Sequence, residues 1–164
     1  MESREPEAPS PGFLLDGMLG TLAKKMRMLG FDAEFSADED DTLIRYRSLS
    51  EGRIVLTRDA RLAERLGEDS WLVSGMDARE EFASVLPFLR PLGLPVKPLT
   101  RCLDCNAMLR ELDREGARNM VPRYVWMTAE RFMVCPRCKK CYWHGTHTDR
   151  MLAEIGEMVE ALTG

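Results

Sequence analysis

Two Cys-x-x-Cys motifs in the second half of the chain limit its fold more than any other pattern. They are Cys102-Leu103-Asp104-Cys105 and Cys135-Pro136-Arg137-Cys138, and 29 residues separate them. Two such motifs supply four thiolates, the ligand set of a closed, structural Zn²⁺ site. The alternative is a set of free or redox-active thiols. All five cysteines lie in this region, and an odd number argues against a disulfide framework.

The fifth cysteine leaves the choice of ligands open. Cys138 and Cys141 form a competing Cys-x-x-Cys pair. We favour Cys135 with Cys138, because Cys141 is followed by two aromatic residues and has the context of a small buried residue in a strand. His144 and His147 are alternative ligands. They are less favoured as ligands because four thiolates are available. The other two interpretations of these histidines are exposed polar residues and groups that approach a substrate phosphate.

Residues 13–98 alternate between short apolar runs and helical periodicity. This rhythm predicts an α/β fold with a parallel sheet covered by helices on both faces. The expected strands are Phe13–Leu15, Ala33–Phe35, Arg53–Leu56 and Trp71–Val73. Helices are expected between them and from Asp77 onwards, and functional sites in such folds lie at the carboxyl ends of the strands.

The rest of the chain divides around this layer. Residues 1–12, rich in proline and glutamate, are expected to be a disordered tail. The prolines of residues 90–98 predict a hinge, followed by a zinc ribbon over residues 99–148. Residues 149–164 have apolar residues at helical spacing and are expected to form a C-terminal packing helix.

The charge of the chain is unevenly distributed. The net charge of −4 argues against a protein that coats nucleic acid through bulk positive charge. Residues 1–99 hold 13 basic and 18 acidic residues, whereas residues 101–150 hold 10 basic and 6 acidic ones. In the second segment, basic residues alternate with Tyr124, Trp126, Tyr142 and Trp143, a pattern suited to phosphate contact and base stacking on single strands. Alternatively, the two tryptophans form the core of the ribbon.

No apolar run is long enough to span a membrane, and the acidic, proline-rich start does not resemble a signal peptide. We therefore expect a cytoplasmic protein that does not act at a membrane.

Acidic residues follow several of the predicted strands. Asp16 and Asp59 stand directly after apolar runs, so in a parallel sheet their side chains are expected at the same edge. The cluster Asp38 to Asp41 and Asp77 also follow strands. Converging carboxylates repel one another unless they bind a hard divalent cation, here Mg²⁺ or Mn²⁺. Such a site can activate water and stabilise charge on a phosphoryl oxygen, as phosphodiester cleavage requires.

These acids also have a structural interpretation. Asp59 and Asp77 occupy positions typical of a helix N-cap, and Glu80 follows Asp77 at the spacing of a capping box. The cluster Asp38 to Asp41 has the composition of a solvated helix start. Asp16 fits this interpretation less well, because the Asp16-Gly17 step exposes its carboxylate on a tight turn. Another α/β class, such as a phosphotransferase, is equally compatible with the pattern.

Five motifs, in order, resemble the Mut-seven C-terminal RNase domain family, over residues 13 to about 151. They are Phe13-Leu14-Leu15-Asp16-Gly17-Met18-Leu19-Gly20, Leu29-Gly30-Phe31-Asp32, Gly52-Arg53-Ile54-Val55-Leu56-Thr57-Arg58-Asp59, Arg101-Cys102 with Cys105-Asn106, and Cys135-Pro136-x-Cys138 with Tyr142-Trp143-x-Gly145-Thr146-His147.

The resemblance implies a PIN-like nuclease domain over residues 13–98, followed by the zinc ribbon. It also implies metal-binding acids at Asp16 and Asp59, with a middle acid at Asp41 in preference to Asp38 or Asp40, and a fourth acid at Asp77. Cys102, Cys105, Cys135 and Cys138 match the zinc ligands of the family. At Cys141 this chain departs from the aliphatic residue usual in the family, which supports treating Cys141 as a non-ligand.

The sequence therefore predicts a metal-dependent ribonuclease that hydrolyses single-stranded RNA, with Mg²⁺ or Mn²⁺ at the acids and a structural Zn²⁺ in a ribbon that aids RNA binding. The main alternative is a non-catalytic RNA- or protein-binding module in which the acids are helix caps. A small phosphatase or nucleotidase is a third hypothesis, and it would not need the ribbon.

Overall fold

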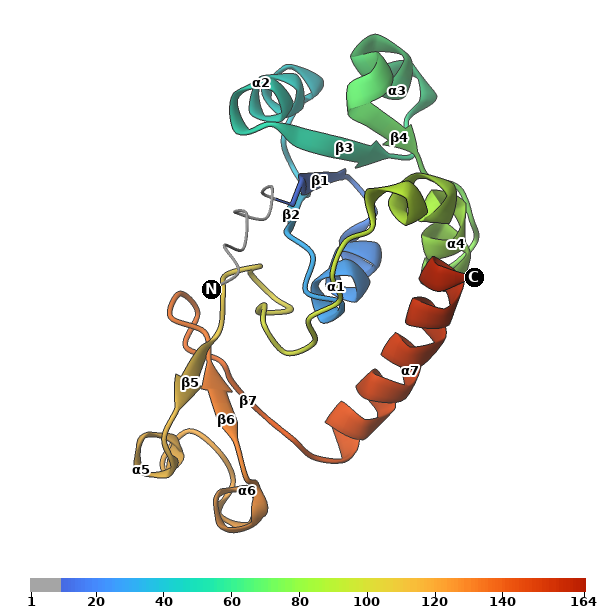
Figure 1. The fold of residues 1–164 in the computed structure, drawn as a ribbon. Helices are drawn as coiled ribbons and strands as arrows, with labels where there is room; N and C mark the ends of the chain where they lie inside the picture. Colours follow the sequence, from blue (N-terminus) through green and yellow to red (C-terminus); the bar gives the residue numbers. More distant parts are fainter. Residues whose placement is uncertain (1–9) are drawn as a thin grey trace, which may run out of the picture.

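The structure, a computed structural model, describes residues 10–164 apart from the side chain of Thr146. Most of the tail expected at residues 1–12 lies outside the described residues, and Gly12 already belongs to the first strand. An α/β layer and a three-stranded ribbon lie side by side, and the last helix runs back from the ribbon along the layer (Figure 1).

The α/β layer alternates strands and helices as the sequence predicts. Its elements are β1 (Gly12–Asp16), α1 (Gly20–Met28), β2 (Ala33–Ser36), α2 (Asp41–Glu51), β3 (Arg53–Thr57), α3 (Ala60–Leu66), β4 (Ser70–Leu72) and α4 (Ala78–Leu89), with short 3-10 turns at Gly67–Asp69 and Arg90–Leu92. All strand pairs are parallel, in the order β2-β1-β3-β4. Their carboxyl ends therefore share one edge of the sheet.

Helices cover both faces of this sheet because side chains alternate between the faces along each strand. On one face, Phe13 and Leu15 of β1 pack in the main core with apolar residues of α1 and α4. On the other face, Leu14 packs in a smaller cluster with Ile44 of α2 and Leu62 of α3. The three layers are visible in Figure 1, with α2 and α3 on one side of the strands and α1 and α4 on the other.

The proline-containing segment that we expected to be a hinge is held against the α/β layer. Lys97 N–H donates to the Leu29 carbonyl over 2.8 Å, and Leu94 and Val96 pack on the main core. Gly30, with φ +90°, lies directly under the Lys97 carbonyl, where a Cβ atom would clash.

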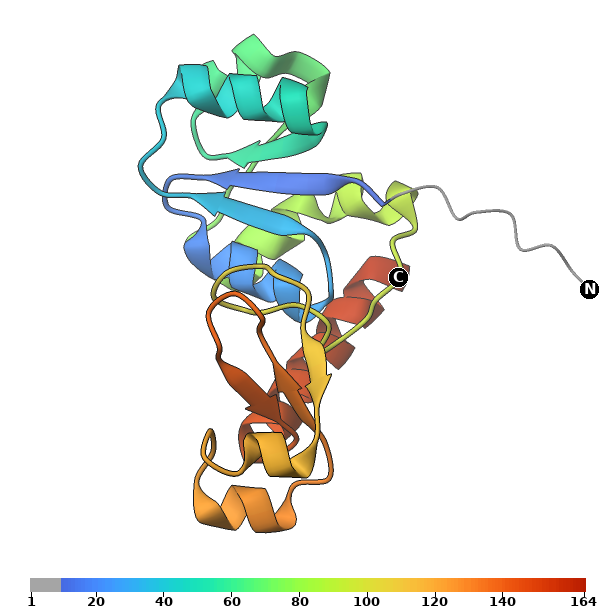
Figure 2. The same cartoon turned by 90° about the vertical axis from the view of Figure 1, so that its left-hand side faces the viewer.

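The predicted zinc ribbon is a separate antiparallel sheet of β5 (Arg110–Leu112), β6 (Phe132–Val134) and β7 (Cys141–Trp143), in that order. Two short helices that we did not predict, α5 (Arg114–Ala117) and α6 (Arg123–Thr128), lie between β5 and β6. They account for the long spacing between the cysteine motifs. The ribbon lies on the β2 side of the parallel sheet (Figure 2).

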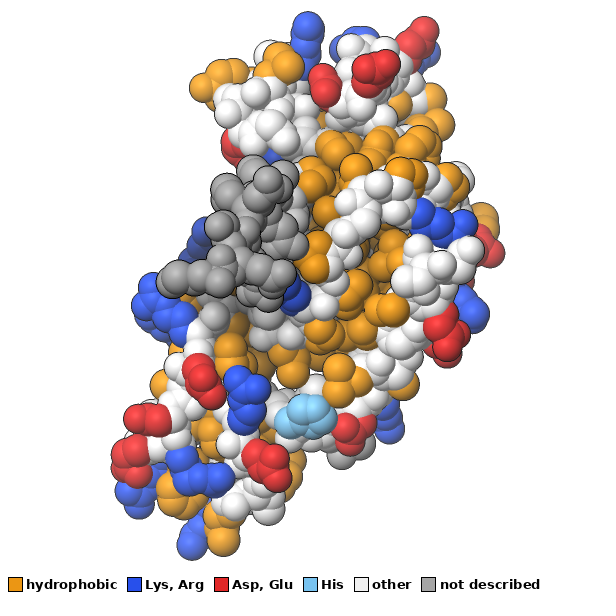
Figure 3. All heavy atoms as spheres, in the orientation of Figure 1, with side chains coloured by type: hydrophobic (Ala, Val, Ile, Leu, Met, Phe, Trp, Pro, Cys, Tyr) orange, Lys and Arg blue, Asp and Glu red, His pale blue; other side chains and the backbone are white. Residues whose placement is uncertain are grey.

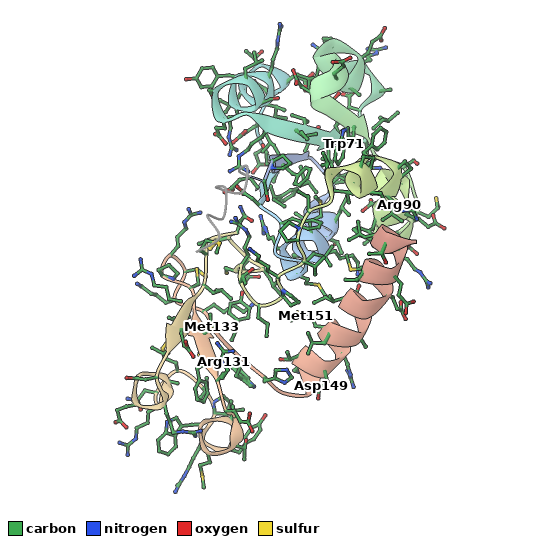
Figure 4. All side chains as sticks on the ribbon, in the orientation of Figure 1. Trp71, Arg90, Arg131, Met133, Asp149 and Met151 are labelled. Carbon is green, nitrogen blue, oxygen red and sulfur yellow. The ribbon has the colours of Figure 1, made fainter. Side chains whose placement is uncertain are left out.

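The last helix, α7 (Thr146–Thr163), joins the ribbon to the α/β layer. Ile155 and Met158 are buried in the main core, and Arg90 Nε donates to the Ala161 carbonyl near the end of the helix. Figure 4 shows Arg90 beside this end and Met151 in the space between α7 and α1. Among residues 10–164, no helix has the length and apolar character needed to cross a membrane.

Candidate functional site

Asp16 and Thr57 are the last residues of the adjacent strands β1 and β3, at the carboxyl edge of the sheet. Thr57 is fully buried, and its hydroxyl donates to Asp16 Oδ2 over 3.0 Å. The same hydroxyl accepts from the Asp59 N–H, also over 3.0 Å. Asp16 and the backbone of Asp59 are thus joined through one buried side chain. Sequence reasoning missed Thr57, although it lies within one of the quoted motifs.

The carboxyl group of Asp16 lies in an environment that disfavours its charge. Burial raises the pKa of Asp16, the Thr57 hydrogen bond partly offsets this effect, and the negative charges of Asp41 and Asp59 raise it further. Burial is thus the main cause of the raised pKa, and the two neighbouring negative charges act in the same direction. A cation placed among these groups would relieve the repulsion.

Within the acidic cluster, the residues have different contacts. Asp40 is the N-cap of α2 and accepts from the Leu43 N–H over 2.9 Å. Asp41 is the first residue of α2, forms an ion pair with Arg65 of α3, and is the member of the cluster whose charge acts on Asp16. These contacts favour Asp41 over Asp40 as the middle acid.

Two further candidate acids, Asp59 and Asp77, also cap helices, as the structural interpretation predicted. Asp59 Oδ1 accepts from the N–H groups of Arg61 and Leu62 at the start of α3. Asp77 accepts from the Glu80 N–H over 2.9 Å at the start of α4, and Glu80 in turn accepts from the Met76 N–H. The structure therefore joins Asp16 to the backbone of Asp59 through Thr57, pairs Asp41 with Arg65, and shows Asp77 in a capping contact.

Arg58 lies between Thr57 and Asp59, next to the acidic edge of the sheet. Its guanidinium forms an ion pair with Glu81 of α4 at 2.9 Å, and Glu81 is itself buried. This partner was not apparent from the sequence, because Glu81 precedes the apolar Phe82 within a helical pattern and has no motif of its own.

The four predicted cysteine ligands form one cluster. The Sγ atoms of Cys102, Cys105, Cys135 and Cys138 all lie within 4.8 Å of one another. Among the described residues, no other group of three or more acidic, histidine or cysteine side chains brings its donor atoms this close. The cluster is consistent with a tetrahedral Zn²⁺ site. The acids at the sheet edge are less tightly gathered.

The cluster also favours thiolate formation at two positions, because the pKa is lowered for both Cys102 and Cys135. Burial raises the pKa of the Cys135 thiol, but the Cys138 N–H and the neighbouring thiols outweigh this effect and lower the pKa to about 6. Zinc binds cysteine as thiolate, so this environment suits a metal ligand.

Cys141 and the two histidines lie outside the cluster. Cys141 is buried in β7 and packs on the small core of the ribbon, as expected for a non-ligand. His144 and His147 are exposed, and His144 Nδ1 lies 3.7 Å from Asp149. The alternative in which histidines replace a thiolate is not supported by this arrangement.

The first cysteine motif is fixed to the α/β layer by buried polar contacts. Asn106, directly after Cys105, has a φ of 68° and accepts from the Ala33 N–H of β2 over 3.0 Å. Its side-chain NH₂ donates to Asp32 over 2.7 Å. Buried Arg27 of α1 donates to the Leu103 carbonyl between the two cysteines. These contacts cover the outer edge of β2 with the ribbon.

The aromatic residues of the ribbon differ in their contacts. Trp126 packs on the ribbon core, and its Nε1–H donates to the Arg114 carbonyl. The Tyr142 hydroxyl donates to or accepts from Cys102 Sγ and accepts from the Leu103 N–H. Trp143 packs on the ribbon core and is partly exposed, whereas Tyr124 is 70% exposed. Trp126 and Tyr142 thus have structural contacts, and Tyr124 is the side chain most open to a ligand.

These observations define a class of protein: an α/β domain with a parallel sheet and acidic side chains at its carboxyl edge, followed by a small antiparallel module with a four-cysteine cluster. The family model described as the Mut7-C RNAse domain matches residues 11–155. The chain therefore belongs to the Mut7-C RNase domain family, as its motifs suggested. Searches of curated proteins and of solved structures each found no match.

Proposed function

We propose that this chain is a Mg²⁺- or Mn²⁺-dependent ribonuclease that hydrolyses phosphodiester bonds of single-stranded RNA. Membership in an RNase family indicates nuclease activity and an RNA substrate. The observation that carries the finer proposal is the Thr57 hydroxyl that joins Asp16 to the backbone of Asp59, where the charges of Asp41 and Asp59 act on Asp16.

The donor set fits a hard divalent cation. Asp16, Asp41 and Asp59 offer carboxylate oxygens, the preferred ligands of Mg²⁺ and Mn²⁺. Burial is the main cause of the raised pKa of Asp16, and repulsion from Asp41 and Asp59 adds to it; a cation bound among these groups would offset both effects. When bound, the ion supplies an activated water and offsets negative charge on the phosphate.

The protein's own residues orient this site. Thr57 fixes Asp16 Oδ2 through its hydroxyl, and the Arg61 and Leu62 N–H groups fix Asp59 Oδ1. Arg65 holds Asp41 through an ion pair on the neighbouring helix. Preorganised carboxylates of this kind reduce the reorganisation needed when a phosphate enters. We further propose a structural Zn²⁺ at the cysteine cluster and a role for the ribbon in RNA binding.

Cleavage of a labelled single-stranded RNA with Mn²⁺ or Mg²⁺ tests the proposal, with Asp16→Asn and Asp59→Asn variants purified in parallel. We expect cleavage by the parent chain and its loss in both variants. Equal cleavage by all three preparations would indicate a contaminating RNase and contradict the proposed site. Turnover of nucleotides by a chain that leaves RNA intact would favour a phosphatase.

A non-catalytic binding module is a second candidate, favoured by the capping contacts of Asp59 and the Asp41–Arg65 ion pair. In that case the parent chain would bind RNA without cleaving it, and Asp16→Asn would raise stability by removing repulsion.

The predicted fourth acid, Asp77, stays a prediction. Asp77→Asn separates its two roles, because asparagine is also a good N-cap. Loss of cleavage with unchanged thermal stability would place Asp77 in the site, whereas unchanged cleavage would leave it as a cap.

A further inference from the structure

A cavity of about 820 Å³ lies between the ribbon, the end of α1 and the first turns of α7. Its size is within the range of small-molecule and cofactor sites. Met28 of α1, Leu103 of the first cysteine motif and Met151 of α7 contribute apolar surface. Figure 3 shows hydrophobic side chains gathered between the ribbon and α7, and Figure 4 shows Met151 in this space. None of the candidate acids and none of the four clustered cysteines lines the cavity, although it borders the cysteine cluster through Leu103 and Tyr142.

Aromatic side chains line the ribbon side of the cavity. Tyr124 of α6 and Trp143 of β7 both contribute to its wall. Tyr124 is 70% exposed although it carries a large aromatic ring. Trp143 packs on the ribbon core with part of its surface and leaves the rest accessible. Every nucleobase has a flat face that stacks on such rings without regard to sequence.

Basic side chains are among the polar residues that line the cavity. Arg150 is exposed, and Lys140 is exposed and forms an ion pair with Asp104 at 2.9 Å; His144 and His147 are further exposed lining residues. The acidic lining residue, Glu154, forms an ion pair with Lys25 of α1, so its charge is compensated. Apolar and aromatic walls next to basic groups complement a base attached to a phosphate.

We propose that this cavity binds one or more unpaired nucleotides of the RNA, with a base against Tyr124 and Trp143 and a phosphate near Arg150 and Lys140. This inference rests on the proposed function, since it takes RNA as the substrate. It adds a base-binding subsite between the ribbon and α7, in contrast to binding along the outer basic surface of the ribbon.

The position of the cavity suits a substrate that also reaches the acidic edge. Helix α1 begins just after Asp16 and ends at Met28, which lines the cavity. At 1.5 Å per residue, its nine residues span about 14 Å. Stacked nucleotides rise by about 3.4 Å each, so the held base lies on the order of four nucleotides from the cleaved bond.

The test measures binding of a labelled single-stranded RNA to the full-length, zinc-loaded chain with Asp16→Asn, which keeps the RNA intact. Tyr124→Ala and Arg150→Gln are compared in this background with the controls Tyr46→Ala and Arg45→Gln. The controls alter an exposed tyrosine and an exposed arginine on α2, away from the cavity. Zinc content and thermal stability are measured for each variant.

We expect Tyr124→Ala to weaken binding about tenfold, the effect of losing one stacked base. Arg150→Gln should reduce the slope of log affinity against log salt by about one. The two controls should bind like the parent. A duplex of the same sequence should show no dependence on Tyr124, because its bases are stacked inside the helix.

If both cavity variants bind RNA as tightly as the parent, and the chain that retains Asp16 still cleaves RNA, the proposed subsite is wrong. The proposed function would be unaffected by this result. Absence of RNA binding by the parent would overturn both. A concentration-dependent dimer that Tyr124→Ala converts to monomer, with RNA affinity unchanged, would instead assign the cavity to a second copy of the chain.

Discussion

At the scale of single residues, the acidic edge depends on a side chain without charge. Thr57 is fully buried at the end of β3, and its hydroxyl contacts both Asp16 and the Asp59 backbone. A valine has nearly the same shape but can neither donate nor accept. Its introduction would leave the packing intact and release the Asp16 carboxylate from one of its hydrogen bonds.

We therefore predict that Thr57→Val lowers kcat/KM for RNA cleavage about fivefold, the effect of losing about 1 kcal/mol of orienting interaction. Thr57→Ser retains the hydroxyl and should keep most of the activity. Initial rates on a labelled single-stranded RNA, compared with melting temperatures, check this. A Thr57→Val chain that cleaves as fast as the parent would contradict the positioning role.

The same residues show how far sequence reasoning reaches at this scale. Asp16 and Asp59 were predictable because strand ends can be recognised from apolar runs, and parallel strands share a carboxyl edge. Thr57 was not, because a threonine in a β-rich run is explained by strand propensity alone. The Arg58–Glu81 ion pair also escaped prediction, since it joins the residue just after β3 to a residue of α4, and only the tertiary fold brings them together.

At the scale of elements, the segment after α4 is fixed by a close approach of two backbones. Gly30 ends the turn after α1 with φ +90°, and the Lys97 carbonyl lies where its Cβ would be. Only glycine tolerates both the positive φ and this contact. The connection between the α/β layer and the ribbon is therefore locked to the end of α1.

Gly30→Ala should destabilise the chain by about 2–4 kcal/mol, from backbone strain and overpacking together. Gly156→Ala is the matched control, because Gly156 is an exposed residue of α7 with no atom near its Cβ position. Alanine there should stabilise the helix by about 0.5–1 kcal/mol. Urea unfolding measures both changes. If Gly30→Ala were as stable as the parent, the linker would not be locked in this way.

The order and type of the elements in the α/β layer followed from the sequence, but those of the ribbon followed only in part. The cysteine spacing predicted four ligands in one cluster, as the structure shows. It did not predict α5 and α6, because each is a short helix whose stability comes from packing on the ribbon core and not from a periodic pattern of its own.

At the scale of the whole molecule, the ribbon and the α/β layer form one polar junction. Asn106 joins the first cysteine motif to Ala33 and Asp32, while Arg27 reaches the Leu103 carbonyl. Asp32 also pairs with Arg53 of β3, so the junction extends into the centre of the parallel sheet. The sequence offered no signal for this contact, since an asparagine after a cysteine motif is equally typical of a turn.

Through this junction, loss of order in the cysteine cluster is expected to remove a hydrogen bond of strand β2. Because Asn106 follows Cys105 directly, disorder of the first motif would remove the acceptor of the Ala33 N–H. We predict that the parent chain binds one Zn²⁺, and that Cys138→Ser prevents this binding, lowers the melting temperature and weakens the hydrogen-exchange protection of the Ala33 amide. Chelation of zinc from the parent chain should have the same effects.

Cys141→Ala is the matched control, since Cys141 is equally close in sequence but is buried in β7 outside the cluster. It should keep its zinc and the Ala33 protection, at a cost of about 1 kcal/mol for the small cavity left behind. Loss of zinc from Cys141→Ala, with zinc retained in Cys138→Ser, would mean that the competing pair supplies the ligand. Loss of zinc without any change at Ala33 would mean that the two modules fold independently. We predict that zinc and the protection of the Ala33 amide are lost together. That result would show that the metal helps to hold the α/β layer and the ribbon in one arrangement.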